Sequence, residues 1–324
     1  MLKIGLVGIG GMGFVHYNAY KRIEGAEVVA VADVRTEMAK EKIKEDKVNI
    51  YSNIDELLAN EKVDVIDICS PSYLHTDIAM KALAAGCHTL SEKPMSVSTA
   101  DTARVIELAK KVGKKFMTAH VVRFMAPYVY LRGVIESGEL GKIVHLNMKR
   151  ISSVPRWSWE DWMRDVKKSG GTPIDLSIHD IDFAYSVFGE PKSVNGIYNE
   201  LKDNNDYIIS NLVYDDFTVT TTGGWFNAQF PFTAEFFAIF ENGMVKLEGG
   251  KLYKNGEEID LAASAKDVSE NMGINIPRAD GYTAEIEYFL ECVKNDEPVT
   301  RVTPESSEGS VRLVERILAN AIKI

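Results

Sequence analysis

The first 33 residues constrain the fold of this chain more than any other stretch. An apolar run, Leu2–Val7, leads directly into Gly8-Ile9-Gly10-Gly11-Met12-Gly13, and Asp33 follows later. A buried strand, a G-x-G-x-x-G turn, a helix and an acid ending the next strand are the parts of a dinucleotide-binding βαβ unit. The glycines allow a tight turn, close approach of a pyrophosphate and a helix N-terminus that faces the phosphates. The residues expected to contact the cofactor here are Gly8, Gly10, Gly11, Met12 and Gly13.

Asp33 ends the second predicted strand, Glu27–Ala32. A carboxylate at this place accepts hydrogen bonds from the ribose hydroxyls and repels a 2′-phosphate, which favours NAD over NADP. Arg35 lies two residues further on and could pair with such a phosphate, so NADP stays open as the alternative. We expect NAD as the cofactor, with Asp33 and Arg35 both at the adenosine ribose.

Bulk composition narrows the class of protein. The 324 residues are 45% hydrophobic and 26% charged, which suits a globular chain with two domains. A net charge of −10 gives no support to binding of nucleic acid or of an anionic membrane. The N-terminus enters a strand at once, without room for a signal peptide, and no apolar run is long enough to span a membrane. Three cysteines without C-x-x-C spacing indicate reduced thiols, so we expect a cytoplasmic protein.

Residues 1–120 alternate short apolar runs with helical patterns, which indicates a doubly wound parallel sheet with crossover helices. Helices are expected at Leu74–Ala85 and Ser98–Val112, among others. The predicted strands are Lys3–Val7, Glu27–Ala32, Asn49–Tyr51, Val63–Cys69, His88–Ser91 and Lys115–Thr118.

The pattern changes beyond residue 120, so we expect an NAD-binding Rossmann domain over 1–120 and a second domain over 121–324. Helices are predicted at Pro127–Ser137, Pro173–Phe188, Thr283–Asn295 and Pro304–Ile322. The intervening turns, such as Asn255-Gly256, are typical of an antiparallel meander. The expected strands are Lys142–Ile151, Ser193–Tyr198, Tyr207–Tyr214, Thr218–Trp225, Thr233–Phe240, Met244–Glu248 and Lys251–Lys254.

Two polar segments follow strands of the first domain. Glu92-Lys93-Pro94 comes directly after the fifth strand, at the sheet edge where ligands of doubly wound folds bind. A residue before proline is kept out of the helical region, so Lys93 is expected to point into the cleft; the alternative is an ordinary surface lysine. Ser70, Pro71 and His75 follow the fourth strand and are expected to border the cofactor.

A second cluster extends from Gly170 to Asp182. Thr172 and Pro173 predict a helix start, with threonine as N-cap and proline in the first turn. Asp175 and His179, four residues apart, then share a face, and a carboxylate beside an imidazole makes a better general base. The alternative is structural: Asp175 completes a capping box with Thr172, and His179 is a core histidine partnered by Asp182.

Other polar residues carry weaker indications. Arg123 lies just past the sixth strand and Trp157 lies in a tryptophan-bearing loop, and both are candidate substrate contacts. His16, His88 and His145 have no acidic or cysteine partner at ligand spacing, so no metal site is expected.

These pieces together resemble the glucose–fructose oxidoreductase, inositol dehydrogenase and rhizopine-catabolism (Gfo/Idh/MocA) family over nearly the whole chain. The resemblance implies a Rossmann domain followed by an α+β domain with an open, mainly antiparallel sheet. The matching pieces are the glycine turn, Ser70-Pro71…His75, Glu92-Lys93-Pro94, Arg123-Phe124…Pro127, Gly138-Glu139-Leu140-Gly141-Lys142-Ile143 and Gly170-Gly171…Asp175…His179…Asp182.

The resemblance also implies that Lys93, Asp175 and His179 match the family's catalytic residues, with Glu92 near the nicotinamide ribose. The run from Ile174 to Asp180 is most similar to the inositol dehydrogenase branch. Two departures leave the substrate open: Thr172 replaces a glycine common in the family, and Val122-Arg123-Phe124-Met125 lacks the Arg-Arg-Phe/Tyr-Asp pattern of many inositol dehydrogenases.

The sequence thus predicts an NAD(H)-dependent dehydrogenase that oxidises a secondary alcohol of a sugar, inositol or related polyol. His179 would take the hydroxyl proton, Asp175 would orient His179, and Lys93 would stabilise the alkoxide; all three would contact the substrate. One alternative is a glycosidase that uses NAD for transient oxidation. Another is a non-catalytic nucleotide or sugar sensor on the same fold.

An aromatic-rich stretch, Thr218–Phe240, bears on assembly. Side chains alternate between the faces of a strand, so this aromatic load predicts an apolar outer face and a homodimer or homotetramer joined across the C-terminal sheet. The alternative is that the aromatic residues fill the core. They are Trp225, Phe226, Phe230, Phe232, Phe236, Phe237 and Phe240.

Overall fold

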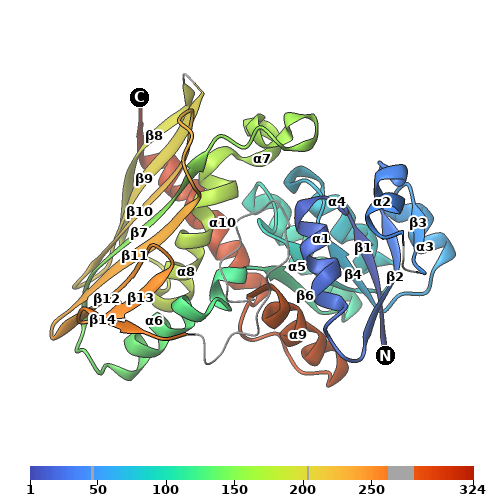
Figure 1. Cartoon of the computed structure of the whole chain (residues 1–324), viewed down its shortest axis with the longest axis horizontal. Coiled ribbons are helices and arrows are strands. Elements are labelled where there is room, and N and C mark those ends of the chain that lie inside the picture. The colour runs from blue at the N-terminus through green and yellow to red at the C-terminus, as the bar shows by residue number, and fades with distance from the viewer. Residues whose placement is uncertain (45–46, 203, 262–280) are drawn as a thin grey trace. The chain divides into compact units, whose positions relative to one another are not determined.

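A computed structural model describes residues 1–44, 47–202, 204–261 and 281–324 (Figure 1). The described residues form two compact units. The first contains residues 1–121 and 282–308, and the second contains 122–261 and 309–324. Residues 282–308, which the sequence analysis placed in the second domain, therefore pack with the first unit. Arg22 of the N-terminal segment donates to Thr283, and Lys115 pairs with Asp296.

The first unit is built on a six-stranded parallel sheet of order β3-β2-β1-β4-β5-β6, the order of the Rossmann fold. The doubly wound prediction is confirmed. Its strands are β1 (Leu2–Val7), β2 (Ala26–Ala32), β3 (Asn49–Tyr51), β4 (Val65–Ile68), β5 (His88–Glu92) and β6 (Phe116–Ala119). Its helices are α1 (Gly11–Tyr20), α2 (Thr36–Lys42), α3 (Ile54–Asn60), η1 (Ser72–Leu74), α4 (His75–Ala84), α5 (Thr99–Val112) and α9 (Gly281–Lys294).

The core of this unit explains the apolar runs of the sequence. Both faces of a parallel sheet are covered by helices, so its strands are largely apolar. Ile66 and Ile68 of β4 are fully buried, and they pack with Leu57 of α3, Leu83 of α4 and Val105 of α5. This packing places the carboxyl ends of β1, β4 and β5 side by side.

The second unit is built on a nine-stranded sheet of order β14-β13-β12-β11-β7-β10-β9-β8-β15. Most neighbours are antiparallel, but β10 runs parallel to β7 and β15 runs parallel to β8, so the sheet is mixed. The prediction of a mainly antiparallel sheet is confirmed. The strands are β7 (Ile143–Ser153), β8 (Ser193–Lys202), β9 (Asn205–Val213), β10 (Thr218–Phe226), β11 (Thr233–Phe240), β12 (Gly243–Glu248), β13 (Lys251–Lys254), β14 (Glu257–Ile259) and β15 (Ala321–Lys323).

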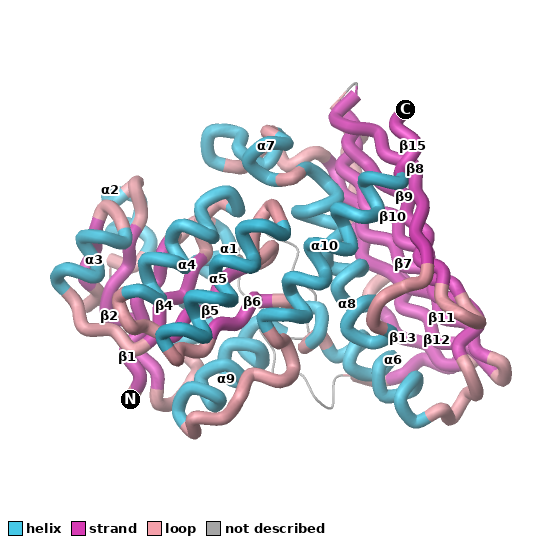
Figure 2. The backbone as a smooth tube through the Cα atoms, turned by 180° about the vertical axis from the view of Figure 1, so that it is seen from behind, coloured by secondary structure: helices cyan, strands magenta, loops and turns pink. Residues whose placement is uncertain are grey.

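Helices cover one face of this sheet, and Figures 1 and 2 both show α6, α8 and α10 on the same side of it. Inward side chains alternate with outward ones, as Leu146 and Met148 of β7 show by their complete burial. The helical segments that lie wholly or partly in this unit are η2 (Val121–Arg123), α6 (Ala126–Ser137), η3 (Trp159–Arg164), α7 (Val166–Ser169), η4 (Pro173–Ser177), α8 (Ile178–Phe188) and α10 (Pro304–Asn320).

One local prediction is wrong: the helix expected to reach Ile322 ends at Asn320, and the last residues instead form β15 beside β8. The helix expected over Pro173–Phe188 is present over these residues, with a π-helical start, η4, before α8. Among the described residues, no helix has the length and apolarity needed to cross a bilayer. The three cysteines are free thiols, as expected.

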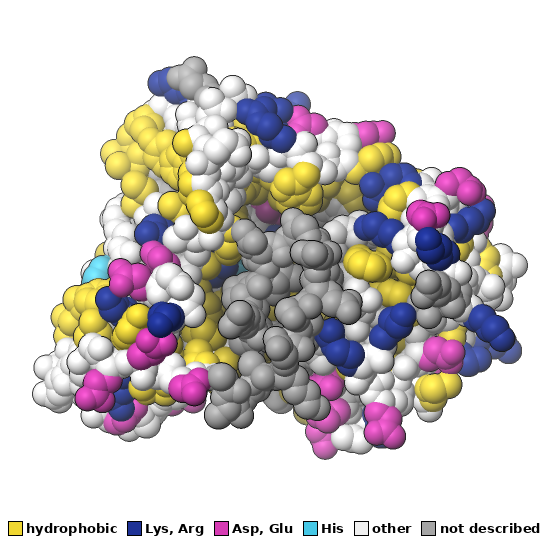
Figure 3. Space-filling view, in the orientation of Figure 1, with side chains coloured by type: hydrophobic (Ala, Val, Ile, Leu, Met, Phe, Trp, Pro, Cys, Tyr) yellow, Lys and Arg dark blue, Asp and Glu magenta, His cyan; other side chains and the backbone are white. Residues whose placement is uncertain are grey.

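The outer face of the second sheet carries fewer aromatic side chains than the sequence suggested. Trp225, Phe236 and Phe240 are buried on the inner face, and Phe237 is the exposed member of the predicted set. The expectation that many aromatic side chains lie on the outer face of the sheet is therefore wrong, because the alternation along β11 turns Phe236 and Phe240 inward. Aliphatic side chains take part instead, and yellow side chains gather along the left margin of Figure 3, over this sheet. The exposed ones include Val144, Ile197, Ile239 and Ile322.

Candidate functional site

In the glycine turn between β1 and α1, the space around Gly10 would accommodate a larger side chain, so packing within the protein does not explain why this residue is glycine. Gly8 has φ +89°, and a Cβ on Gly13 would overlap the carbonyl oxygen of Gly8. A Cβ on Gly10 would meet only Arg35 Nη2, at 3.9 Å. Within the described residues, no side chain caps the N-terminus of α1. Open space above uncapped N–H groups is what a pyrophosphate needs, so the turn fits a dinucleotide.

Asp33 joins the end of β2 to this turn. Its Oδ2 accepts from the Ile9 N–H at 3.0 Å, and its Oδ1 accepts from the Arg35 N–H at 2.8 Å and from Arg35 Nε at 3.2 Å. Lys42 Nζ donates to the carbonyl oxygens of Ile9 and Gly10. The predicted ribose acceptor is thus held in place beside two cations.

The loops after β4 and β5 are joined by His75. Its Nδ1 lies 2.8 Å from the Pro94 carbonyl oxygen and its Nε2 lies 2.9 Å from the Ser70 carbonyl oxygen. His75 is buried and fastens the two loops, whereas the Ser70 hydroxyl is buried without a protein hydrogen-bond partner among the described residues. A buried hydroxyl of this kind fits a polar group of a bound cofactor.

Lys93 follows β5 in the first unit, in a turn that its neighbours hold. The Lys93 N–H donates to Glu92 Oε2 at 3.0 Å, and the Lys93–Pro94 peptide bond is cis. Glu92 is buried, and although burial raises the pKa of a carboxyl, the adjacent His16 brings the pKa of Glu92 below its ordinary value. Glu92 is therefore an anion next to the backbone of Lys93.

His16 is a functional candidate that the sequence analysis missed. It was expected to have no acidic or cysteine partner, and this expectation is wrong. Its Nδ1 lies 2.8 Å from Asp67 Oδ2, and Cys69 Sγ lies 3.7 Å from Asp67 Oδ1. The three ligand-type atoms lie within 4.8 Å of one another. Hydrogen bonds account for this grouping, and we assign no metal to it.

In the second unit, Asp206 of β9 organises the segment before Asp175. Asp206 Oδ2 accepts from the Thr172 N–H at 2.7 Å, and Thr172 Oγ1 donates to the Asp206 carbonyl oxygen at 2.7 Å. Burial raises the pKa of Asp206 to about 6. Thr172 has helical backbone angles and its side chain makes no capping hydrogen bond, so the predicted N-cap is wrong and the alternative of a capping box with Asp175 does not hold. Gly170 and Gly171 both have positive φ, while Thr172 does not need to be glycine.

Asp175 lies in the π-helix η4 and His179 in the first turn of α8. π-helical turns recur at functional sites. Asp175 is buried and His179 is partly buried. Because Thr172 uses its side chain on Asp206, the structural explanation of Asp175 as part of a capping box does not apply.

Two other acids of this helix have structural partners. Asp182 receives Arg123 through two bonds, from Nε to Oδ2 at 2.8 Å and from Nη2 to Oδ1 at 2.6 Å, and it also accepts from Ser310 Oγ. Asp180 pairs with Arg150 in the same buried layer. The pairing favours a structural role for Arg123 over the substrate contact predicted from its position.

Trp157, the other predicted substrate contact outside the catalytic set, lies on the loop between β7 and η3. Its side chain is 70% exposed. The described contacts of the second unit thus leave this indole on the surface.

Comparison with protein families decides the classification. Residues 2–120 match the model of the oxidoreductase family with an NAD-binding Rossmann fold (GFO_IDH_MocA), and residues 128–246 match the GFO/IDH/MocA C-terminal domain. The chain belongs to this oxidoreductase family. Its first unit is accordingly an NAD-binding Rossmann domain, as the glycine turn predicted.

Individual relatives differ in their named substrates. Myo-inositol 2-dehydrogenase of Thermotoga maritima is 30% identical over 58% of this chain and 55% of its own length. Glucose-6-phosphate 3-dehydrogenase of Bacillus subtilis is 30% identical over 58% of this chain and 54% of its own length. The chain thus spans little more than half the length of these curated relatives.

Solved structures show the same fold over the full chain. The scyllo-inositol dehydrogenase of Lactobacillus casei, with bound NAD(H) and scyllo-inositol, superposes with a TM-score of 0.80 at 22% identity. The superposition covers 99% of this chain and 97% of that chain. At this identity the likeness establishes the fold.

Proposed function

We propose that this family member is an NAD-dependent dehydrogenase that oxidises a secondary alcohol of a sugar, inositol or related polyol. The observation that carries the proposal is the Lys93 turn, held at the carboxyl end of β5 by Glu92 and His75 in an NAD-binding domain. Ligands of this fold bind at that edge of the sheet. The relatives named as inositol and sugar-phosphate dehydrogenases support the alcohol class.

The proposed chemistry assigns one task to each residue. NAD, when bound, supplies the carbon that accepts the hydride. His179 removes the hydroxyl proton of the substrate, and Asp175 orients the imidazole for that transfer. Lys93 stabilises the oxygen as negative charge develops on it. Gly8, Gly10, Gly11, Met12 and Gly13 would hold the pyrophosphate, Asp33 and Arg35 the adenosine ribose, and Ser70, Pro71, His75 and Glu92 would border the nicotinamide end.

Net formation of NADH on a panel of inositols, sugars and sugar phosphates tests this proposal. A dehydrogenase accumulates NADH in proportion to substrate consumed. Hydrolysis of an aryl glycoside without net NADH would instead indicate a glycosidase that oxidises its substrate transiently. Tight binding of NAD and sugar with no turnover of either would indicate a sensor.

NAD should exceed NADP in catalytic efficiency by at least about tenfold, or about 1.4 kcal/mol, because the Asp33 carboxylate meets the 2′ position. Steady-state kinetics with both cofactors check this. Asp33→Asn should lower the ratio of catalytic efficiencies with NAD and NADP, since the amide keeps an acceptor for the Ile9 N–H but lacks the negative charge that repels a 2′-phosphate. Equal efficiencies in the unaltered protein would mean that Arg35 compensates for Asp33.

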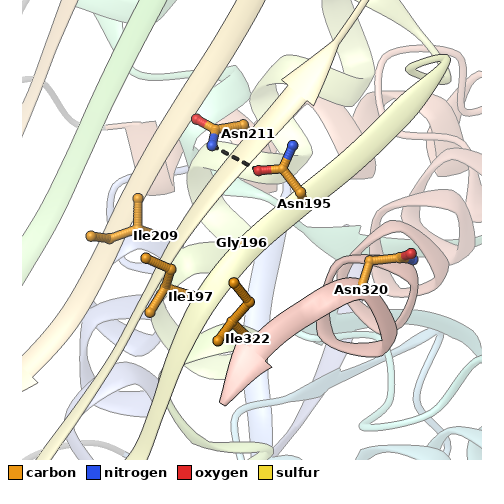
Figure 4. Close-up of a pocket in the computed structure, with 7 residues that line it drawn as sticks. All are labelled: Asn195, Gly196, Ile197, Ile209, Asn211, Asn320 and Ile322. Carbon is orange, nitrogen blue, oxygen red and sulfur yellow. Dashed lines mark hydrogen bonds between the residues drawn. The ribbon is translucent and has the colours of Figure 1, made fainter. Parts of the chain in front are cut away.

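We also propose that the second unit binds the substrate and that two or four copies associate through its open sheet face. A depression of about 330 Å³ lies on this face at β8, β9 and β15 (Figure 4). Ile197, Ile209 and Ile322 line it together with an amide pair in which Asn211 donates to Asn195. Exposed aliphatic groups around such a hollow suit a second copy of the same surface.

Light scattering at micromolar concentration should therefore give a mass of two or four times 36.0 kDa. Ile197→Glu should shift the mass toward the monomer, since it introduces a charge at the proposed interface, whereas Asp55→Asn in the first unit should not. A monomer mass for the unaltered protein would overturn the proposal.

A further inference from the structure

A completely buried histidine connects the glycine-turn helix to the turn that carries Lys93. His16 lies on α1, and its ring is enclosed by the first unit. Nδ1 lies 2.8 Å from Asp67 Oδ2 on β4, and Nε2 lies 3.2 Å from Glu92 Oε1 at the end of β5. One ring thus joins a helix to the carboxyl ends of two neighbouring strands.

Nδ1 is hydrogen-bonded to Asp67, whereas Nε2 lies at ion-pair distance from Glu92 without an aligned hydrogen bond among the described residues, so the two carboxylates favour the imidazolium form chiefly through their charge. Burial alone would lower the pKa of His16, but the charges and hydrogen bonds of Asp67 and Cys69 together outweigh it, and the pKa is raised well above the ordinary value. The His16 imidazolium is the positive charge in a buried cluster whose other ionisable side chains are acidic or neutral. The ionisable groups around it are Asp67 of β4, Cys69 just after β4, Glu92 of β5, Tyr20 of α1 and Tyr282 of α9, with Glu285 of α9 acting on Tyr20.

Glu92 transmits this arrangement to Lys93. One of its oxygens faces His16, and the other accepts the Lys93 N–H at 3.0 Å. On the far side of the same turn, His75 contacts the Pro94 carbonyl oxygen. The backbone at Lys93 is therefore held by Glu92 before it and, through Pro94, by His75 after it. The contact with Glu92 depends on charge, and His16 supplies the opposite charge.

We propose that His16 is a positioning residue for Lys93. Its imidazolium holds the Glu92 carboxylate, and this carboxylate fixes the backbone from which the Lys93 side chain extends. Without the cation, Asp67 and Glu92 would be two buried carboxylates with no balancing charge from the ring. Glu92 would then take up a proton or turn away, and either change would release the Lys93 N–H. The role in turnover rests on the proposed function.

Kinetics of three variants test the coupling. His16→Gln and Glu92→Gln should each lower kcat at least about tenfold per folded molecule, and the double variant should be no worse than the poorer single one. The matched control is His88→Gln at the opposite end of β5, where the ring accepts from the Lys115 N–H; its kcat should not change. If the fold-loss in kcat of the double variant equals the product of the two single losses, the proposal is overturned, because His16 would then act independently of Glu92.

Two further measurements do not depend on turnover. Nitrogen NMR of labelled histidine should show His16 protonated on both nitrogens at pH 8, with the resonance identified by its absence in His16→Gln. A neutral ring would overturn the proposal. The labelling rate of the Lys93 amine, measured by mass spectrometry, should change at least about threefold in His16→Gln, while that of Lys81 stays constant. An unchanged rate would also overturn it. If the unaltered protein oxidises no polyol, the proposed function fails, and the NMR and labelling results together decide the role of His16.

Discussion

Replacing His179 by alanine should lower turnover by at least about 100-fold, or about 2.7 kcal/mol in activation free energy. The imidazole is assigned the substrate proton, and a methyl group cannot accept it. Lys93→Ala should have an effect of similar size, because the alkoxide would lose its cationic partner. Affinity for NAD should change little in both variants. Steady-state kinetics and NAD titration of the same preparations make the comparison.

Asp175→Asn serves as the companion to His179→Ala. The amide retains the shape of the carboxyl group but not its charge, so turnover should fall through the loss of an oriented, basic imidazole. Its unfolding temperature is measured alongside, because Asp175 is buried and a loss of stability must be separated from a loss of catalysis. Near-full turnover of His179→Ala would make His179 a structural residue and remove the proposed general base.

Local patterns predicted the parts of the fold in which neighbours in sequence are neighbours in space. The glycine turn is one of these, because its strand, turn and helix are contiguous: Gly8 has a positive φ, and Gly13 lies directly against the Gly8 carbonyl oxygen. The alternation along β11 was predictable too. Which of its faces would be covered was not, because that depends on the helices packed against the sheet.

The errors have a common physical cause. Thr172 looked like an N-cap, but Asp206, 34 residues away, takes both its N–H and its hydroxyl. His16 looked isolated, but its partner Asp67 is 51 residues away. Asp67 itself was the available indication, since an acid within an apolar strand needs a buried cation or donor. Pairings over such distances become visible only when the strand order is known.

Arg123 provides the largest expected change in stability. Its guanidinium is buried and forms two bonds with Asp182, so Arg123→Met would leave a buried carboxylate without its cation. Breaking a pair of this kind costs about 3–5 kcal/mol of unfolding free energy. Urea denaturation should show this loss, whereas Arg132→Met, a matched change at a half-exposed arginine that bonds Ser186, should cost less than about 1 kcal/mol.

The same variant separates the two roles considered for Arg123. If Arg123 is structural, the double variant Arg123→Met with Asp182→Asn should be more stable than the sum of the single losses predicts, since the amide removes the unbalanced charge while keeping an acceptor for Ser310. The KM for the polyol should then stay within about twofold in whatever fraction remains folded. If Arg123 instead contacts the substrate, stability should barely change and KM should rise at least about tenfold, because a charged hydrogen bond to a hydroxyl would be lost. The ion pair with Asp182 makes the first outcome the expected one.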